Sequence, residues 1–296
     1  MRNMIRAFIL LMGVALAVTA VRAGETGHYV NGVEGIKAAS VPGPGFYSRT
    51  YLAYYSADDL KDADGDDAMV DFSVDVAAAV TRLIYVSPVK MFGADFGVYL
   101  TMPVQKTDVE VGAAGDEDAG MGDMSVSPFM LSWHKPRWDA SLAYEVIIPT
   151  GDTGEMASNG KDFFGHMFTL GGTYYFDAQK AWSASILSRF EINTEKEDTD
   201  VDPGEDFHFE WGVARTVKPG FDIGLAGYCH WQVTDDEGSD VVWDADVHDR
   251  VFAAGPEVSY FYAPWRLNVS LRHLMEFGAK DRSEGALTCL TLTKVF

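Results

Sequence analysis

The C-terminal stretch ALTCLTLTKVF, residues 286–296, alternates apolar and polar side chains and ends on an aromatic residue. In an extended strand, Leu290, Leu292 and Phe296 share one face and Cys289 lies on the other, because successive side chains point to opposite sides. An alternating strand that stops on a terminal aromatic is typical of the last strand of a bacterial outer-membrane barrel. A β protein can cross a bilayer only as a closed barrel, since every backbone N–H and C=O needs a partner within the protein. This stretch therefore predicts the architecture of the chain before it.

The N-terminus has the features of an export signal. Arg2 and Arg6 precede an apolar run over 7–21, and small residues lead to a cleavage site after Ala23. The alternative, a membrane anchor, needs about 20 apolar residues, more than this run supplies. We therefore predict a signal peptide over 1–23. No later segment has eighteen consecutive apolar residues, which excludes a helical inner-membrane protein.

Composition agrees with an exported barrel. The mean hydropathy of −0.04 and the aromatic content of 13% fit strands that face lipid on one side and water on the other, with aromatic girdles at the interfaces. The net charge is −21. Loss of the three arginines of the signal leaves 20 basic against 44 acidic residues, a net −24. Binding to nucleic-acid phosphates is thereby excluded.

The two cysteines are not expected to form a disulfide. Cys229 lies on the outward parity of its strand and Cys289 on the inward parity of the last one. Opposite faces of a barrel wall cannot bring the two Cα atoms within the ~4–7 Å that a bridge requires.

Alternating segments recur from Phe46 to the end, separated by connections that are alternately short and long. They predict an up-and-down antiparallel barrel of about 12 strands over 46–296, an even number as expected when both termini lie on the periplasmic side. The predicted strands are 46–56, 68–87, 94–109, 123–134, 137–149, 163–176, 181–194, 206–217, 221–234, 249–262, 265–278 and 284–296. The loops at 57–67, 110–122, 150–162, 195–205 and 235–248 are long, and the one at 279–283 is shorter.

Parity assigns the two faces of each strand. The aromatic and aliphatic face belongs to lipid and the charged face to the lumen, because an ionised group at the bilayer midplane costs ~2–4 kcal/mol. Arg82 and His166 fall on apparently lipid-facing parities. Each lies either near an interface, where long side chains snorkel, or next to a bulge that shifts the register.

The charged parity gives a set of candidate lumen residues. They are Arg49, Tyr51, Asp71, Asp75, Asp95, Tyr99, Asp139, Glu145, Arg189, Glu191, His208, Glu210, Asp222, Tyr228, His230, Glu257, Arg272 and Glu276. One interpretation is structural: an ion-paired network fills the interior, with the arginines as cross-lumen partners of the carboxylates. The other is a pore that favours cations or neutral solutes, in which tyrosines contact an aromatic solute.

Residues 24–45 carry little strand signal and are interpreted either as a periplasmic segment or as a small plug that threads the lumen. The acidic loop containing Asp62, Asp64 and Asp66 is interpreted as a solvated loop of mutually repelling carboxylates, and the sharper hypothesis is that it loosely binds Ca²⁺ or Mg²⁺. Such outer loops could bridge through divalent cations to lipopolysaccharide. No other cofactor is expected.

An enzyme is one hypothesis, because some outer-membrane barrels are phospholipases with a Ser–His pair. Such a pair is easiest at His-x-Ser on one strand face. The residues two positions after His134, His166, His208, His230 and His273 are not serine. We predict that the chain is not an enzyme.

Several stretches resemble one family. They are GHYVNGVEGI at 27–36, PGPGFY at 42–47, SWHK at 132–135, IPTG at 148–151 and LTKVF at 292–296. The sequence is similar to outer-membrane proteins grouped under the MetA pathway of phenol degradation, including SphA-like barrels. The resemblance implies a Gram-negative outer-membrane barrel tied to uptake of hydrophobic or aromatic compounds, and it supplies no catalytic residues.

Three functions follow as hypotheses. The first is a passive channel for hydrophobic or aromatic small molecules, and the second a structural or surface-interaction barrel with a closed lumen and acidic, cation-binding loops. An enzyme comes last. Expected partners are outer-membrane lipid, lipopolysaccharide, a small hydrophobic solute, and the barrel-assembly machinery through the Phe296 strand.

Overall fold

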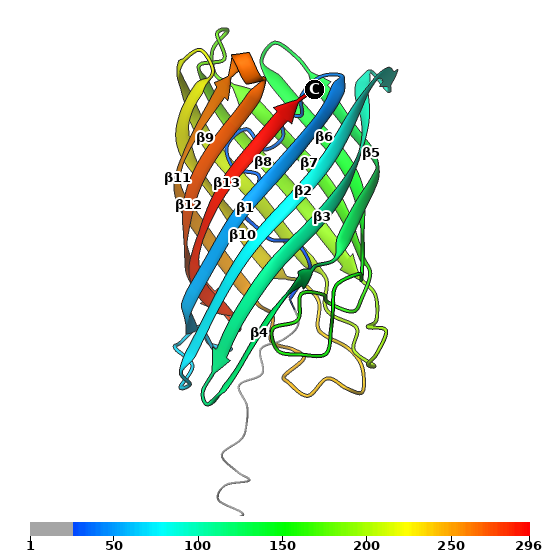
Figure 1. The fold of residues 1–296 in the computed structure, drawn as a ribbon, viewed down its shortest axis with the longest axis vertical. Coiled ribbons are helices and arrows are strands. Elements are labelled where there is room, and N and C mark those ends of the chain that lie inside the picture. Colours follow the sequence, from blue (N-terminus) through cyan, green and yellow to red (C-terminus); the bar gives the residue numbers. More distant parts are fainter. Residues whose placement is uncertain (1–25) are drawn as a thin grey trace, which may run out of the picture.

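The computed structural model describes residues 26–296; the predicted signal peptide lies outside the described residues. Antiparallel β-strands dominate these residues (Figure 1). The strands are β1 (Gly45–Leu60), β2 (Phe72–Met91), β3 (Ala94–Val111), β4 (Ala114–Met121), β5 (Met124–His134), β6 (Trp138–Ile148), β7 (Gly165–Tyr175), β8 (Trp182–Asn193), β9 (Asp206–Lys218), β10 (Phe221–Gln232), β11 (Arg250–Tyr262), β12 (Leu267–Lys280) and β13 (Ser283–Val295).

The sheet closes on itself. Each strand from β5 to β12 pairs with its two neighbours, β13 pairs with β12 and β1, and β2 pairs with both β1 and β3. β4 pairs only with the second half of β3, while the first half of β3 pairs with β5. β4 is thus a hairpin arm rather than a wall strand, and the remaining strands form a closed twelve-stranded wall. The predicted all-β barrel of about 12 strands is confirmed.

Short and long connections alternate between the two ends, as predicted. We call the end that carries the short turns the turn end, and the opposite end the loop end (Figure 1). At the turn end, β2 and β3 are joined by Phe92 and Gly93, both with positive φ, which suits the tight turn of a hairpin. The predicted loop 110–122 is instead largely the β3–β4 hairpin. The one helix among the described residues, Ala263–Trp265, is a short 3₁₀ turn, and no helix in 26–296 is long and apolar enough to cross a membrane.

The outer wall carries the large apolar side chains. Leu170, Leu225 and Met275 are among the most exposed, at 64%, 57% and 58%. Such exposure would be costly in water and suits contact with lipid. Cys229 and Cys289 are both free, which confirms that they form no disulfide.

The core lies inside the barrel rather than between layers. Residues 26–44 run through the interior from the loop end to the turn end, where the chain enters β1 (Figure 1). The candidate site is built from this segment, hereafter the inner segment, and the inward-facing side chains of the wall.

Candidate functional site

The inner segment contacts the wall along its whole length. At the loop end, the Lys161 ammonium donates to the Thr26 hydroxyl over 2.6 Å. Farther along, the Lys37 ammonium lies 2.8 Å from the Asp222 carboxylate, and the Ser40 hydroxyl lies 3.1 Å from that of Tyr175. A segment without helix or strand is therefore held by side chains of several different strands.

Glu34 is the centre of this contact. Its carboxylate is 2.7 Å from Nη1 of Arg82, 2.8 Å from Nη1 of Arg49 and 3.5 Å from Nη2 of Arg189. The Tyr51 hydroxyl donates to it over 3.1 Å. Glu34 is only 4% exposed, so the three guanidinium groups rather than water compensate its charge.

Wall carboxylates hold the backbone on either side of Gly35. Oε2 of Glu210 accepts the N–H of Glu34 over 2.9 Å, and Oε2 of Glu257 accepts the N–H of Ile36 over 2.8 Å. Between them, Gly35 has φ +71°, and a Cβ there would lie 2.1 Å from Glu257 Oε2. Only glycine fits this conformation and this space.

Arg272 contacts the same turn next to Glu257. Its guanidinium pairs with Glu257 over 3.2 Å and donates to the carbonyl oxygen of Val33. The side chain is 1% exposed. The guanidinium charge of Arg272 is therefore compensated by the Glu257 carboxylate and by the backbone of the inner segment.

His28 forms a second clasp near the loop end. Nδ1 lies 3.2 Å from Glu191 Oε1, and Nε2 lies 3.3 Å from Asp123 Oδ2. Burial opposes protonation of the imidazole, but the hydrogen bonds with Asp123 and Glu191 outweigh it and raise the pKa of His28. Burial likewise works against ionisation of Asp123, yet its bonds from His28 and the Gly151 N–H lower the pKa of that carboxyl. The clasp is therefore an ion pair at mildly acidic pH.

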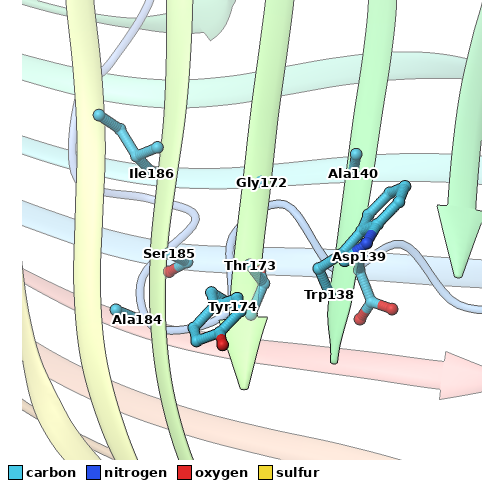
Figure 2. Close-up of a pocket in the computed structure, with 9 residues that line it drawn as sticks. All are labelled: Trp138, Asp139, Ala140, Gly172, Thr173, Tyr174, Ala184, Ser185 and Ile186. Atoms are coloured by element: carbon cyan, nitrogen blue, oxygen red, sulfur yellow. The ribbon is translucent and has the colours of Figure 1, made fainter. Parts of the chain in front are cut away.

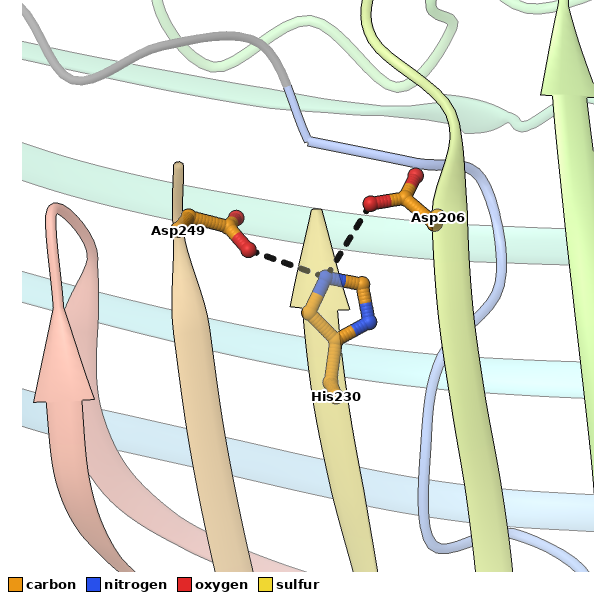
Figure 3. A group of neighbouring side chains, drawn as sticks. All are labelled: Asp206, His230 and Asp249. Atoms are coloured by element: carbon orange, nitrogen blue, oxygen red, sulfur yellow. Dashed lines mark ion pairs between the residues drawn. The ribbon is translucent and has the colours of Figure 1, made fainter. Parts of the chain in front are cut away.

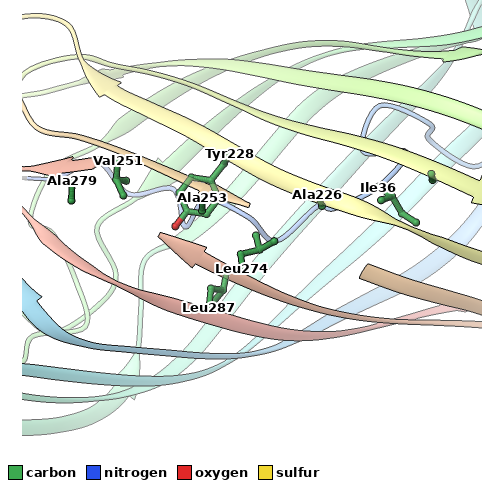
Figure 4. Close-up of a cluster of buried hydrophobic side chains, with 9 residues drawn as sticks. Ile36, Ala226, Tyr228, Val251, Ala253, Leu274, Ala279 and Leu287 are labelled. Carbon is green, nitrogen blue, oxygen red and sulfur yellow. The ribbon is translucent and has the colours of Figure 1, made fainter. Parts of the chain in front are cut away.

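Two apolar patches line the interior. The larger joins Ile36 of the inner segment to inward side chains of β9 to β13 (Figure 4). Its other members are Ala214, Ala226, Tyr228, Val251, Ala253, Leu274, Ala279 and Leu287. The second comprises Tyr47, Ile84, Val86, Tyr99, Met130 and Ala143, with Val41 packed against it. The lumen thus offers apolar surface as well as charge.

A separate depression of about 410 Å³ lies at β6, β7 and β8 (Figure 2). Gly172 leaves space there between Trp138, Tyr174 and Ile186, which all lie on the outward parity of their strands. It belongs to the lipid-facing wall and not to the lumen.

Most of the predicted lumen residues occupy inward-facing positions, and the inner segment brings many of them together. Those with inward parity are Arg49, Tyr51, Asp95, Tyr99, Asp139, Glu145, Arg189, Glu191, His208, Glu210, Asp222, Tyr228, His230, Glu257, Arg272 and Glu276. The arginine partners differ from the expected cross-lumen pairs. Arg189 pairs with Glu210 on the adjacent strand at 3.1 Å, and Arg272 pairs with Glu257 on its own neighbour.

The predicted lumen placement is wrong for two residues, Asp71 and Asp75. Asp75 opposes Ser56 on the outward parity and accepts a hydrogen bond from the exposed Tyr54 hydroxyl over 2.6 Å, and Asp71 is exposed before β2 begins. In β2, Val76, Ala78, Val80 and Arg82 face inward, so the rule that apolar means lipid-facing fails there. β2 has 20 residues, about twice what a bilayer crossing needs, so Asp75 can lie on an outer face near the loop end. Arg82 faces the lumen, so neither snorkelling to an interface nor a bulge is required to explain its position in the strand.

The loop that carries the predicted metal ligands forms a turn held by one of its own carboxylates. Asp62 Oδ1 accepts the backbone N–H groups of Asp64 and Asp66 over 2.9 and 3.0 Å, so this carboxylate closes the turn. In residues 26–296 only one group of three metal-ligating side chains converges, and it does not include these aspartates.

Sequence reasoning missed Glu34, Arg82, His28 and Asp123. Glu34 and His28 stand in a segment without periodicity, and Arg82 stands on a parity that is otherwise apolar. The signals that could have found them are the charges themselves: a carboxylate in a glycine-rich segment and an arginine in an apolar strand each need a buried partner.

Comparison with known proteins agrees with the fold. The COG4313 outer membrane channel from Pseudomonas putida F1 is similar at a TM-score of 0.77 and 12% identity, covering 91% of this chain and 100% of that one. The translocator domain of the autotransporter NalP from Neisseria meningitidis gives 0.51 and 8%, covering 86% and 90%. The search of curated proteins gave no match. The family model described as "Putative MetA-pathway of phenol degradation" matches residues 57–292, and the chain belongs to this family.

Proposed function

We propose that this protein is an outer-membrane channel of a Gram-negative bacterium for passive uptake of hydrophobic or aromatic small molecules. The observation that carries the proposal is a lumen lined by two apolar patches, against which Ile36 and Val41 of the inner segment pack. The phenol-degradation description of the family supports an aromatic substrate.

In this proposal the inner segment is the closure. With Glu34 bound to three arginines, the middle of the lumen is blocked. Displacement of the segment would uncover the inward face around Leu274 and Leu287, along which an apolar solute can move without losing contact area. Tyr55 and Tyr228, whose hydroxyls both donate to Glu276, would present ring faces to an aromatic solute.

Liposome uptake tests this function. The processed chain and a variant lacking residues 26–44 are reconstituted, and entry of radiolabelled phenol and of a sugar of similar size is compared with protein-free liposomes. The proposal predicts that the intact protein accelerates phenol entry more than sugar entry, and that the shortened variant loses this selectivity. Equal acceleration of both solutes by the intact protein would favour a nonspecific pore, and no acceleration of either would favour a structural barrel.

The finer partners belong to the same proposal. Phe296, 61% exposed beside Phe46 at the turn end, would be read by the barrel-assembly machinery. In the acidic loop of Asp62, Asp64 and Asp66, the exposed carboxylates of Asp64 and Asp66 would attract Ca²⁺ or Mg²⁺ and, through them, lipopolysaccharide. Millimolar calcium should then raise the melting temperature of the protein in lipopolysaccharide-containing micelles. An unchanged melting temperature would refute cation binding by this loop.

A further inference from the structure

Three buried side chains converge near the loop end of the lumen (Figure 3). Nε2 of His230 on β10 lies 3.3 Å from Oδ1 of Asp206 on β9 and 3.0 Å from Oδ1 of Asp249, which immediately precedes β11. Their exposed fractions are 4%, 2% and 2%. The sequence gives no spacing motif for this group, because the three residues come from three neighbouring strands.

Their polar atoms are close but unsatisfied. His230 Nε2 and Asp249 Oδ1 lack a partner with hydrogen-bond geometry, and so does Oδ2 of Asp206, the carboxylate oxygen that does not face His230. A single N–H on Nε2 cannot point at two carboxylates at once, since its direction is fixed in the plane of the ring. The one imidazole nitrogen therefore leaves at least one of the two carboxylate oxygens that face it without a donor, which is costly for a buried group.

The contacts around His230 favour an imidazole whose Nε2 can act as a metal ligand. Nδ2 of Asn31, in the inner segment, lies 3.3 Å from His230 Nδ1, while the amide oxygen of Asn31 has no partner. A half-turn of that amide lets Nδ1–H donate to the oxygen, which satisfies both groups and leaves the Nε2 lone pair directed at the carboxylates. Metal-bound histidines ordinarily donate their other N–H in this way.

The carboxylates are also positioned to act as metal ligands. Arg282 pairs with Oδ2 of Asp249 over 3.2 Å, which leaves Oδ1 free for the convergence point. Two ligand atoms about 2.0–2.1 Å from a tetrahedral ion are roughly 3.3 Å apart, close to the separations seen here.

We propose that Asp206, His230 and Asp249 bind a divalent transition-metal cation of the Zn²⁺ or Mn²⁺ type. The imidazole ligand favours these ions over Ca²⁺ and Mg²⁺, which prefer oxygen only. The ion would tie β9, β10 and β11 together directly beside the inner segment, where a Cβ on Gly27 would lie 2.2 Å from Asp206 Oδ2. It would stabilise the docked segment through Asn31.

A matched control exists in the same lumen. His134 also contacts two carboxylates, but each through a different nitrogen, Nδ1 to Asp139 at 3.1 Å and Nε2 to Asp95 at 3.8 Å. Lys90 already pairs with Asp95. The ligand atoms around His134 therefore do not converge.

The test is calorimetric titration of ZnCl₂ into the full processed chain in detergent after chelator treatment. We expect one ion per chain, at least tenfold weaker binding in H230Q and D249N, about tenfold weaker binding in N31A, and unchanged binding in H134Q. Absence of a stoichiometric site, or equal affinity in wild type and H230Q, would overturn the proposal and leave a protonated histidine between two aspartates. Should H230Q fail to fold, visible absorption of the Co²⁺-loaded wild type decides: intense bands support the site, and the spectrum of free aqueous Co²⁺ refutes it.

Discussion

Replacing Glu34 with alanine removes the one carboxylate that three arginines share. Arg82 and Arg49 lose partners at 2.7 and 2.8 Å, while Arg189 keeps Glu210 at 3.1 Å. Deleting one member of a buried ion pair costs about 3–5 kcal/mol, because the remaining charge is left uncompensated. The penalty falls only on the state in which the inner segment is docked, since a displaced segment leaves the arginines free to hydrate.

That free energy converts into a population. At 1.4 kcal/mol for each factor of ten, the ratio of displaced to docked segment should rise by roughly 100- to 4,000-fold. Single-channel recording in planar bilayers measures this ratio as the fraction of time spent in a high-conductance state. E34A should therefore open far more often than the wild type.

The control is D222N. Asp222 pairs with Lys37 of the same segment at 2.8 Å, but both side chains are partly exposed, at 18% and 25%, so its loss should cost only about 0–1 kcal/mol. Equal open fractions in E34A and wild type, or a larger effect in D222N, would refute the claim that Glu34 fastens the segment.

Three further changes probe the same closure. Gly35→Ala places a Cβ 2.1 Å from Glu257 and adds about 1–2 kcal/mol of left-handed strain; it should raise open probability, whereas Gly43→Ala, which meets nothing within 4 Å, should behave as wild type. Arg272→Met should lower the temperature of the heat-modifiable gel shift, because Glu257 loses its ion-pair partner. R272K should restore only part of the lost temperature, since lysine cannot reproduce the forked contacts of the guanidinium. Full restoration by lysine would show that the forked contacts do not matter. The His28 pKa is raised above 6.5 and that of Asp123 lowered below 3.8. The clasp is therefore complete at pH ~4–6.5, weakens as pH rises through the His28 pKa, and weakens in acid as pH falls through that of Asp123. Protease protection of residues 26–44 should follow this pH profile in wild type and not in H28Q. Identical profiles in the two proteins would show that His28 does not hold the inner segment.

The wall of the barrel was predictable because parity and turn chemistry repeat in every strand. Strands such as 206–217 alternate an aromatic face of Phe207, Phe209 and Trp211 with a polar face of His208 and Glu210, so one strand suffices to place both surfaces. The order and pairing of the strands follow from their short turns.

The interior was less predictable because its specificity is not periodic. Asp75 could be misplaced because the inward face of β2 is apolar. The partners of Arg49 and Arg82 lie on a segment that has neither strand nor helix pattern, and Asp206, His230 and Asp249 meet only through strand register. Local patterns fix the face on which a residue lies, whereas the identity of its partner depends on the closed three-dimensional structure.

The central claim is that the inner segment lies inside the barrel and closes it. Carbodiimide treatment of the reconstituted protein tests it without mutation, because a carboxylate and an ammonium in contact become an amide. Mass spectrometry should find the Lys37–Asp222 link, whose atoms are 2.8 Å apart, and phenol uptake should fall as that link accumulates. Lys106–Glu117, an exposed pair also at 2.8 Å, reports that the reagent worked. Recovery of the Lys106–Glu117 link without Lys37–Asp222, or undiminished uptake in fully linked protein, would contradict the account.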